Sequence, residues 1–206
     1  MTRVRLLGLL EGIAVSRRAS EGIEYAQFLF EEEQVQVIFL KPFQATAGGN
    51  QFGPYEEGRE AKLPLWVAEV LGENGVAKLK DEDAKIIRSG ELYKLSWKEE
   101  RNETLSQLPP HFYPKVRALL RSIDDGIRQT PTSTLLIEQR QSQMKAKDMI
   151  NCRLQKILRL AMERSPTKSL IDLLSPEERG LYTVLRSEIE GWRQRIIVDD
   201  PKTRVR

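Results

Sequence analysis

The sequence predicts an α+β protein: a small N-terminal β-rich domain followed by an all-α helical-bundle domain. Three observations predict this fold class. Polar and β-branched residues alternate at residues 34–37, the pattern from residue 81 onward is helical, and residues 132–163 contain neither Gly nor Pro. We expect four segments: an N-terminal extension (1–23), a β-rich domain with one short helix (24–80), a helical domain (81–198) and a polar tail (199–206).

The β-rich domain is predicted to begin with two strands. Tyr25–Phe30 and Gln34–Leu40 are short runs rich in aromatic and β-branched residues. The acidic run Glu31–Glu33 lies between them and is typical of a hairpin turn. Three carboxylates could also bind a metal ion, but consecutive side chains point in different directions. We therefore favour the turn.

The rest of this domain is predicted to contain a loop, a short helix and one more strand. Gln44–Glu60 is rich in Gly and polar residues and lacks the Lys and Ser/Thr spacing of a phosphate-binding loop, so we expect a connection. Leu63–Leu71 is predicted to be helical, with Pro64 at the first position, where a missing N–H costs nothing. Val76–Leu79 can return as a strand, and Trp66 is expected in the core.

The longest predicted helix, Thr132–Glu163, would span roughly 45 Å. Thr132 or Ser133 can act as its N-cap. Residues 138–143 are all polar, so this half is expected to protrude or to meet a partner. The other half is expected to pack through an apolar stripe with helical spacing: Ala146, Met149, Ile150, Leu154, Ile157, Leu158 and Ala161.

Three further helices complete the predicted bundle. One is predicted to run from Asp81 to about Leu105, because the acidic residues at its start favour a helix N-terminus. Another is predicted to span His111–Gln129. The closing helix begins with a capping box, in which Ser175 is the N-cap and Glu178 reaches back to the cap N–H. Its apolar residues recur every three or four positions: Leu181, Leu185, Ile189, Trp192 and Ile196.

Charge is distributed unevenly along the 206 residues. The net charge is −4 over residues 1–104 and +7 over residues 105–206. A basic helical half would suit contact with nucleic acid or with acidic protein surfaces, but its cations are interspersed with acids, which favours solvated helix faces. The alternative of a basic nucleic-acid-binding module lacks interleaved aromatics and any helix-turn-helix or zinc signature. It would use Arg117, Arg121, Arg128, Arg140, Lys145 and Lys147.

Residues able to carry chemistry are scarce. Cys152 and His111 are the single cysteine and histidine, which excludes a disulfide within the chain and a Cys/His zinc site. No acid/base pair, nucleophile constellation or phosphate loop stands out, so we expect no enzyme, cofactor, metal or small-molecule substrate. No apolar run approaches eighteen residues, and Glu11 interrupts the apolar run that follows Arg3 and Arg5, so neither a membrane span nor a signal peptide is expected. An intracellular location is the default.

Two stretches carry a resemblance to a known family. The first is Gly53–Tyr55 followed by Leu63–Leu71, a Gly-Pro-aromatic loop and an apolar-Pro-Leu-Trp turn leading into a short helix; the second is Lys147–Ile157 in the long helix. Together they resemble the GINS DNA-replication complex, specifically the archaeal subunit related to eukaryotic partner-of-Sld-five subunits two and three. The resemblance covers roughly Glu24 to Ile197. The order of domains, β first and helical second, agrees with that type.

The resemblance implies a non-enzymatic scaffold. Two copies of this subunit would assemble with two copies of a sister subunit whose helical domain comes first. The heterotetramer would link the MCM replicative helicase to a Cdc45 or RecJ-like protein at replication forks, in the cytoplasm and associated with the nucleoid. A weak, sequence-independent DNA contact could coexist with this role.

Candidate site residues fall into two groups. Residues of the family motif are expected to be structural: Gly53, Pro54, Leu63, Pro64, Leu65 and Trp66. Residues of the long helix are candidates for a subunit interface: Ile137, Arg140, Met144, Asp148, Met149, Arg153, Lys156 and Ile157. Asp148, Arg153 and Lys156 could pair across helices and fix the register between subunits. They could equally form exposed or intramolecular ion pairs that contribute less than about 1 kcal/mol.

Overall fold

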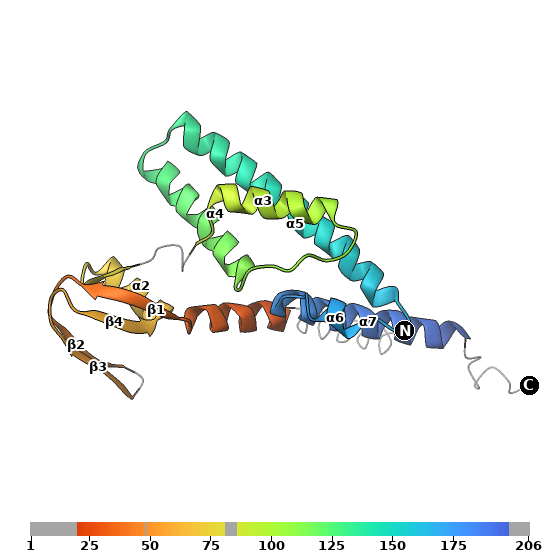
Figure 1. Cartoon of the computed structure of the whole chain (residues 1–206), viewed down its shortest axis with the longest axis horizontal. Coiled ribbons are helices and arrows are strands. Elements are labelled where there is room, and N and C mark those ends of the chain that lie inside the picture. The colour runs from red at the N-terminus through yellow and green to blue at the C-terminus, as the bar shows by residue number, and fades with distance from the viewer. Residues whose placement is uncertain (1–19, 48, 81–85, 198–206) are drawn as a thin grey trace, which may run out of the picture.

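A small β part lies at one end of the molecule, and the helices extend from it (Figure 1). The computed structural model describes residues 20–47, 49–80 and 86–197. A helix over residues 20–31 comes first. It is followed by β1 (Gln34–Phe39), β2 (Phe43–Ala47), β3 (Asn50–Tyr55), β4 (Glu60–Pro64), α2 (Leu65–Glu73), β5 (Ala77–Leu79), α3 (Ser89–Arg101), α4 (Phe112–Gln129), α5 (Ser133–Met162), α6 (Lys168–Ile171) and α7 (Pro176–Ile197). The predicted α+β class is confirmed.

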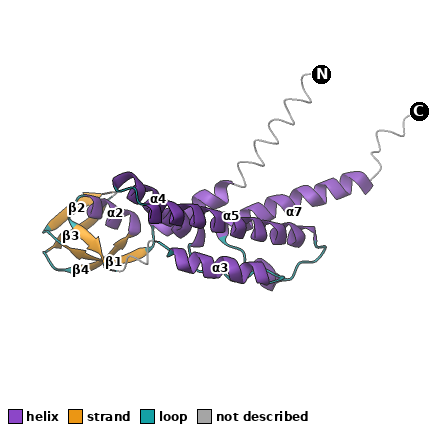
Figure 2. Ribbon diagram, turned by 90° about the horizontal axis from the view of Figure 1, so that it is seen from above, coloured by secondary structure: helices purple, strands orange, loops and turns teal. Residues whose placement is uncertain are grey.

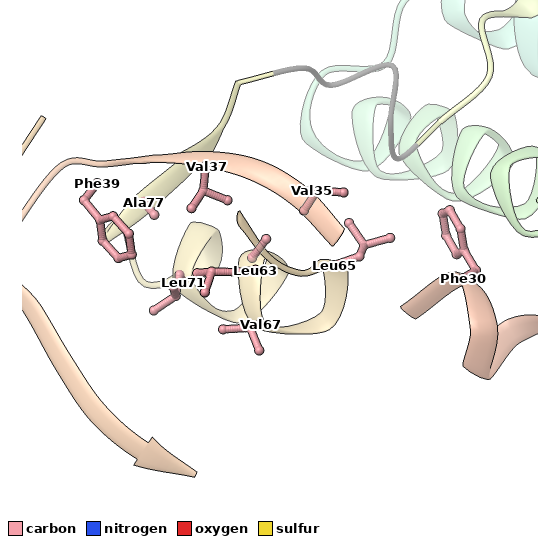
Figure 3. Packing of buried hydrophobic residues seen from close by; sticks show 10 residues of the cluster. Phe30, Val35, Val37, Phe39, Leu63, Leu65, Val67, Leu71 and Ala77 are labelled. Atoms are coloured by element: carbon pink, nitrogen blue, oxygen red, sulfur yellow. The ribbon is translucent and has the colours of Figure 1, made fainter. Parts of the chain in front are cut away.

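The β part is built on strand β1, which pairs antiparallel with β4 on one side and β5 on the other. Val35, Val37 and Phe39 of β1 are buried, as the alternation in the sequence predicts. Helix α2 covers this face with Val67 and Leu71 (Figure 3). One apolar core therefore lies between a three-stranded sheet and a short helix.

The predicted strand Tyr25–Phe30 is wrong, because these residues belong to the helix over residues 20–31. Ala26 and Phe30, four residues apart, are each 3% exposed, which is a helical spacing that the aromatic content concealed. The acidic run Glu31–Glu33 is consequently no hairpin turn: Glu31 ends this helix, and Glu32 and Glu33 connect it to β1. The predicted boundary between residues 23 and 24 falls inside the helix.

This first helix bridges the two parts of the protein. Phe30 at its end packs into the β core beside Val35 and Leu65 (Figure 3). Near its start, a Cβ built on Gly22 would lie 3.1 Å from the carbonyl oxygen of Pro176, at the beginning of α7. The helix therefore ties the β part to the closing helix of the bundle.

The predicted loop Gln44–Glu60 is also wrong, because it contains the hairpin formed by β2 and β3. The hairpin register shifts between Phe43 and Ala45, so a simple alternation is interrupted. Aromatic side chains attach the hairpin to the core: the ring of Phe39 stacks on that of Tyr55 at 4.4 Å and on that of Phe43 at 6.1 Å. The contact of Phe39 with Tyr55 joins residues that are distant in the sequence, and local pattern does not reveal it.

Two details of the family motif differ from expectation. Pro64 is the N-cap of α2 and the last residue of β4, rather than the first helical residue. Trp66 is 39% exposed and not a core residue, because α2 turns Leu65, Val67 and Leu71 toward the sheet instead.

The four predicted helices of the bundle all exist, with shifted ends. Thr132 caps α5, its Oγ1 accepting a hydrogen bond from the Leu135 N–H at 3.2 Å. Helix α3 is shorter than predicted, since it begins at Ser89 and ends at Arg101; residues 81–83 lie outside the described part. Helix α4 begins at Phe112 because His111 adopts a left-handed conformation, with φ of 55°.

Helix α5 is the spine of the bundle. Its first half packs with α3 and α4 around Ala146 and Met149, and its second half packs with α7 around Ile157 and Leu160. Figure 2 shows α3 on one outer side of α5, with α7 continuing beyond its end. A single helix thereby links two hydrophobic clusters.

An ionic core beneath a candidate assembly interface

The guanidinium of Arg153, in the middle of α5, is completely buried and fully hydrogen-bonded. It forms two hydrogen bonds with Glu178 of α7, from Nε to Oε1 at 2.5 Å and from Nη2 to Oε2 at 2.8 Å. Its Nη1 donates to Glu99 Oε2 and to the Ser106 carbonyl oxygen, both at 2.9 Å. Paired geometry of this kind is what a buried arginine requires.

Glu99 of α3 is the second acid of this core and is also completely buried. Lys156 Nζ donates to its Oε1 at 2.6 Å, and the Ser106 N–H and hydroxyl donate to its Oε2. Burial raises the pKa of Glu99, but the hydrogen bonds from Lys156 and Ser106 and the charge of Arg153 lower it further, so the net shift is downward. Glu99 is therefore held as a carboxylate.

Glu178 serves the core and its own helix at once. Its Oε2 accepts the Ser175 N–H at 3.0 Å while the Glu178 N–H lies 3.3 Å from Ser175 Oγ, which confirms the predicted capping box. Its Oε1 also accepts the Tyr113 hydroxyl at 2.5 Å. Burial, with the charge of Glu178, raises the pKa of Tyr113 well above its ordinary value, so the phenol keeps its proton.

Together these side chains join helices α3, α4, α5 and α7 through one ionic core: Glu99, Ser106, Tyr113, Arg153, Lys156 and Glu178. Burying charges is costly unless each finds partners, and here each charged group is paired. Burial lowers the pKa of Arg153, but its bond to Glu178 and the charges of Glu178 and Glu99 raise it more, so it stays charged. The core fixes how the four helices sit together.

The candidate interface residues of α5 do not share one face. Met149, Arg153 and Ile157 are buried inside the chain, and Lys156 is half-buried against Glu99. Four others are exposed: Ile137, Arg140, Met144 and Asp148. Asp148 does not join the ionic core, since its nearest ion-pair partner is Lys145 at 3.7 Å. Arg153 pairs within its own chain, so it can affect an interface only through the arrangement of the helices.

Part of the apolar stripe predicted to pack is instead exposed. Ile150, Leu154 and Leu158 of that stripe are exposed, and Met162, which was not part of the prediction, continues them at the same four-residue spacing; the four are between 36% and 49% exposed. We call these four residues the outer stripe. The predicted set was too broad for one buried face, because Leu154 and Leu158 lie about 100° or more around α5 from Met149 and Arg153, and Ile150 lies at the edge between the two sets. The width of the apolar stripe, greater than one buried helix face, was the sign in the sequence that part of it would be exposed.

A groove of about 480 Å³ opens beside the outer stripe. Side chains from the first helix, α4, α5 and α7 line it, among them Ile23, Tyr113, Ile150, Leu154 and Leu181. Arg153 and Glu178 also contribute to its lining, but both are saturated with hydrogen bonds. The groove and the outer stripe form one continuous apolar surface through Ile150 and Leu154. Such surfaces on folded proteins are typical of protein interaction sites.

The motif residues Gly53, Leu63 and Leu65 have structural positions. Leu63 and Leu65 are 3% and 1% exposed in the β core, and Pro54 follows Gly53 in the hairpin strand β3. Gly53 has φ of 92°, and a Cβ there would lie 2.6 Å from the Phe43 carbonyl oxygen. No other residue fits this position without distortion.

The six cations of the alternative nucleic-acid module are spread over two helices, and several are engaged. Arg117 donates to Gln27 Oε1 at 2.8 Å, Lys145 lies 3.4 Å from Glu100, and Arg128 lies 3.6 Å from Asp125. Burial lowers the pKa of Arg117 despite the charge of Glu177. Arg121, Arg140 and Lys147 are exposed. The described residues therefore do not assemble these six cations into one free basic face.

Within the described ranges, no helix is long and apolar enough to cross a membrane, and no three His, Cys, Asp or Glu side chains gather as a metal site. The prominent features are a saturated ionic core and an apolar surface beside it. An apolar surface of this kind on a helical bundle is typical of proteins that act through contact with other proteins.

The family model described as Sld5: GINS complex protein helical bundle domain matches residues 86–197, more than half of the chain. The chain belongs to this GINS family. Members are non-catalytic scaffold subunits of a DNA-replication complex, so membership implies that this chain is not an enzyme. No curated protein matches the sequence significantly.

Proposed function

We propose that this chain is the archaeal GINS subunit of the type related to partner-of-Sld-five subunits two and three. It assembles with a sister subunit into a 2:2 heterotetramer, which links the MCM helicase to a Cdc45 or RecJ-like protein at replication forks inside the cell. The β part preceding the matched helical domain, and the two motifs at Gly53–Tyr55 and Lys147–Ile157, support this type. We also propose that the chain divides into a β-rich and a helical unit near residues 80–86.

One observation carries the assembly proposal: the outer stripe and its groove leave apolar side chains in solvent on the central helix. Ile150 and Leu154 expose 45% and 36% of their surfaces although they belong to a well-packed bundle. Covering such side chains with a partner removes apolar area from water, which favours association. A parallel or antiparallel helix of the sister subunit has the shape to lie along a stripe with a four-residue repeat.

The exposed candidates Ile137 and Met144 extend the proposed interface toward the start of α5. They are 57% and 52% exposed, and Arg140 and Asp148 lie on the exposed surface between and beyond them. Polar residues at the edge of an apolar contact favour one register over others. We propose that Arg140 and Asp148 have this role.

Light scattering after size exclusion tests the proposal, with the chain alone and co-expressed with a candidate sister subunit from the same genome. A stable species with the mass of two copies of each chain supports the scaffold assignment. The tetramer should then retain the MCM helicase and a Cdc45 or RecJ-like protein in pull-downs. A well-behaved monomer that ignores the sister subunit would remove the proposal.

A further inference from the structure

The solvent-facing side of α3 carries an aromatic residue among cations. Lys94, Trp97, Lys98 and Arg101 lie at spacings of three, four and seven residues, so they share one helix face. All four are exposed, and Trp97 exposes 56% of its surface. We call these four residues the Trp97 face. The sequence-based candidates did not include it, although its spacing is visible in the sequence.

The cations of the Trp97 face are not neutralised by acids of their own chain. Among the residues that the structure describes, Lys94, Lys98 and Arg101 form no ion pair, whereas Lys145 on the neighbouring helix pairs with Glu100. On this helix, Glu91 lies one turn before Lys94. Three positive charges are therefore available to an anionic ligand.

Arg101 also contacts the aromatic ring of Trp97 and restrains it. Its guanidinium carbon lies 4.0 Å from the centroid of the Trp97 ring, within the range of a cation–π contact. This contact restrains the indole while more than half of the side chain remains in solvent. A restrained, solvent-exposed aromatic plane beside cations is the combination that single-stranded nucleic acids bind.

We propose that the Trp97 face binds single-stranded nucleic acid. A base stacks on the indole of Trp97, and neighbouring phosphates contact Lys94 and Lys98, which lie about 6 Å apart along the helix axis. The flat indole favours this ligand over an acidic peptide, because every base offers an aromatic face whereas carboxylates satisfy only the cations. The inference goes beyond scaffolding, since it assigns a nucleic-acid contact to this chain.

The Trp97 face and the outer stripe lie on opposite sides of α5. Helix α3 contacts α5 through Lys145, Cys152 and Lys156. Leu154 is two residues from both Cys152 and Lys156, which places it about 200° around the helix from each. Subunits can therefore cover the outer stripe and leave the Trp97 face open, so the two proposals can fail separately.

Fluorescence anisotropy with a labelled oligo-dT of about 15 nucleotides tests the proposal. The full chain is used, and if it forms a complex with a co-expressed sister subunit, that complex is used. Trp97→Ala should weaken binding about tenfold, the loss of one stacked base. Two neutralised phosphates, at Lys94 and Lys98, predict that wild-type affinity falls roughly sevenfold between about 50 and 200 mM salt. Lys94→Gln with Lys98→Gln should flatten this dependence.

Matched controls are available on the same chain. Trp192 is an exposed tryptophan of α7, and Trp192→Ala should leave oligo-dT affinity unchanged. Lys147 and Lys168 are exposed lysines away from α3. Lys147→Gln combined with Lys168→Gln should also leave the affinity unchanged. Three results would overturn the proposal: no binding of the wild-type chain, equal affinity for Trp97→Ala, or displacement by polyglutamate as effective as by unlabelled oligo-dT. The last would identify an acidic protein surface as the ligand.

Discussion

Arg153 of α5 and Glu178 of α7 form a doubly hydrogen-bonded ion pair in the interior of the bundle, and Glu178 simultaneously closes the capping box of its own helix. The same carboxylate therefore starts α7 and fixes its position against α5. One side chain therefore takes part both in the cap at the start of α7 and in the contact between α7 and α5. It also explains why Arg153, which the sequence presents as an interface candidate, is 0% exposed.

Arg153→Ala should destabilise the protein by about 3–5 kcal/mol, because it leaves the carboxylates of Glu99 and Glu178 buried without their shared partner. Urea denaturation followed by circular dichroism measures the change. Arg159→Ala removes an exposed arginine from the same helix and should change stability by less than about 0.5 kcal/mol. Equal stability of the two variants would contradict the structural role of the ionic core.

Stability should fall in acid partly through Glu99. Its pKa lies below the ordinary value of 4.5 in the folded chain, so the unfolded chain takes up this proton first as the pH falls. The stabilisation is therefore complete above about pH 4.5 and is lost as the pH falls from there through the folded pKa.

The free energy of unfolding of the wild type and of Glu99→Gln, measured from pH 7 to pH 3, checks this expectation. The variant should be less stable at neutral pH, and the difference should shrink in acid, where the wild-type carboxyl is also protonated. Glu100→Gln is the matched control, because that neighbour is exposed and interacts at the surface with Lys145. A difference that stays constant with pH would rule out titration of Glu99 as the cause.

Gly53→Ala should weaken the attachment of the β2–β3 hairpin. The new Cβ would meet the Phe43 carbonyl oxygen at 2.6 Å, and φ of 92° is unfavourable for alanine. Gly58→Ala is the control, since its φ of 79° imposes similar backbone strain while nothing lies within 4 Å of the added Cβ. We expect Gly53→Ala to cost at least about 1 kcal/mol more than Gly58→Ala in thermal or urea unfolding. Similar costs would mean that the hairpin moves to accept the methyl group.

Leu154→Glu should reduce assembly with the sister subunit without unfolding the chain, because Leu154 lies at the centre of the outer stripe and is already 36% exposed. A charge buried in an apolar interface without a partner is costly. Light scattering of the co-expressed proteins reports the loss of tetramer mass, and circular dichroism verifies the fold. Gln155→Glu adds the same charge at the adjacent exposed position and should leave the tetramer intact. Loss of assembly in both variants would indicate a general effect of charge.

The positions of several elements could be predicted from local patterns, because their signals lie within a few residues of each other. The length of α5 follows from a run without Gly or Pro and from the Thr132 cap, and the start of α7 follows from Ser175 and Glu178. Strand β1 follows from its alternation. The hairpin β2–β3 was missed because its stability depends on aromatic contacts with Phe39 outside the segment.

By itself, the sequence determined the α+β class, the order of the two parts and the caps of α5 and α7, since these depend on periodicity and on hydrogen bonds between near neighbours. Only the tertiary structure decided that Tyr25–Phe30 is helical, because Phe30 must reach the β core from a helix that begins beside α7. It also decided which faces of α5 are covered. Glu99 and Arg153 are 54 residues apart, and their pairing exists only after α3 packs on α5, so no local pattern could assign Arg153 to the interior.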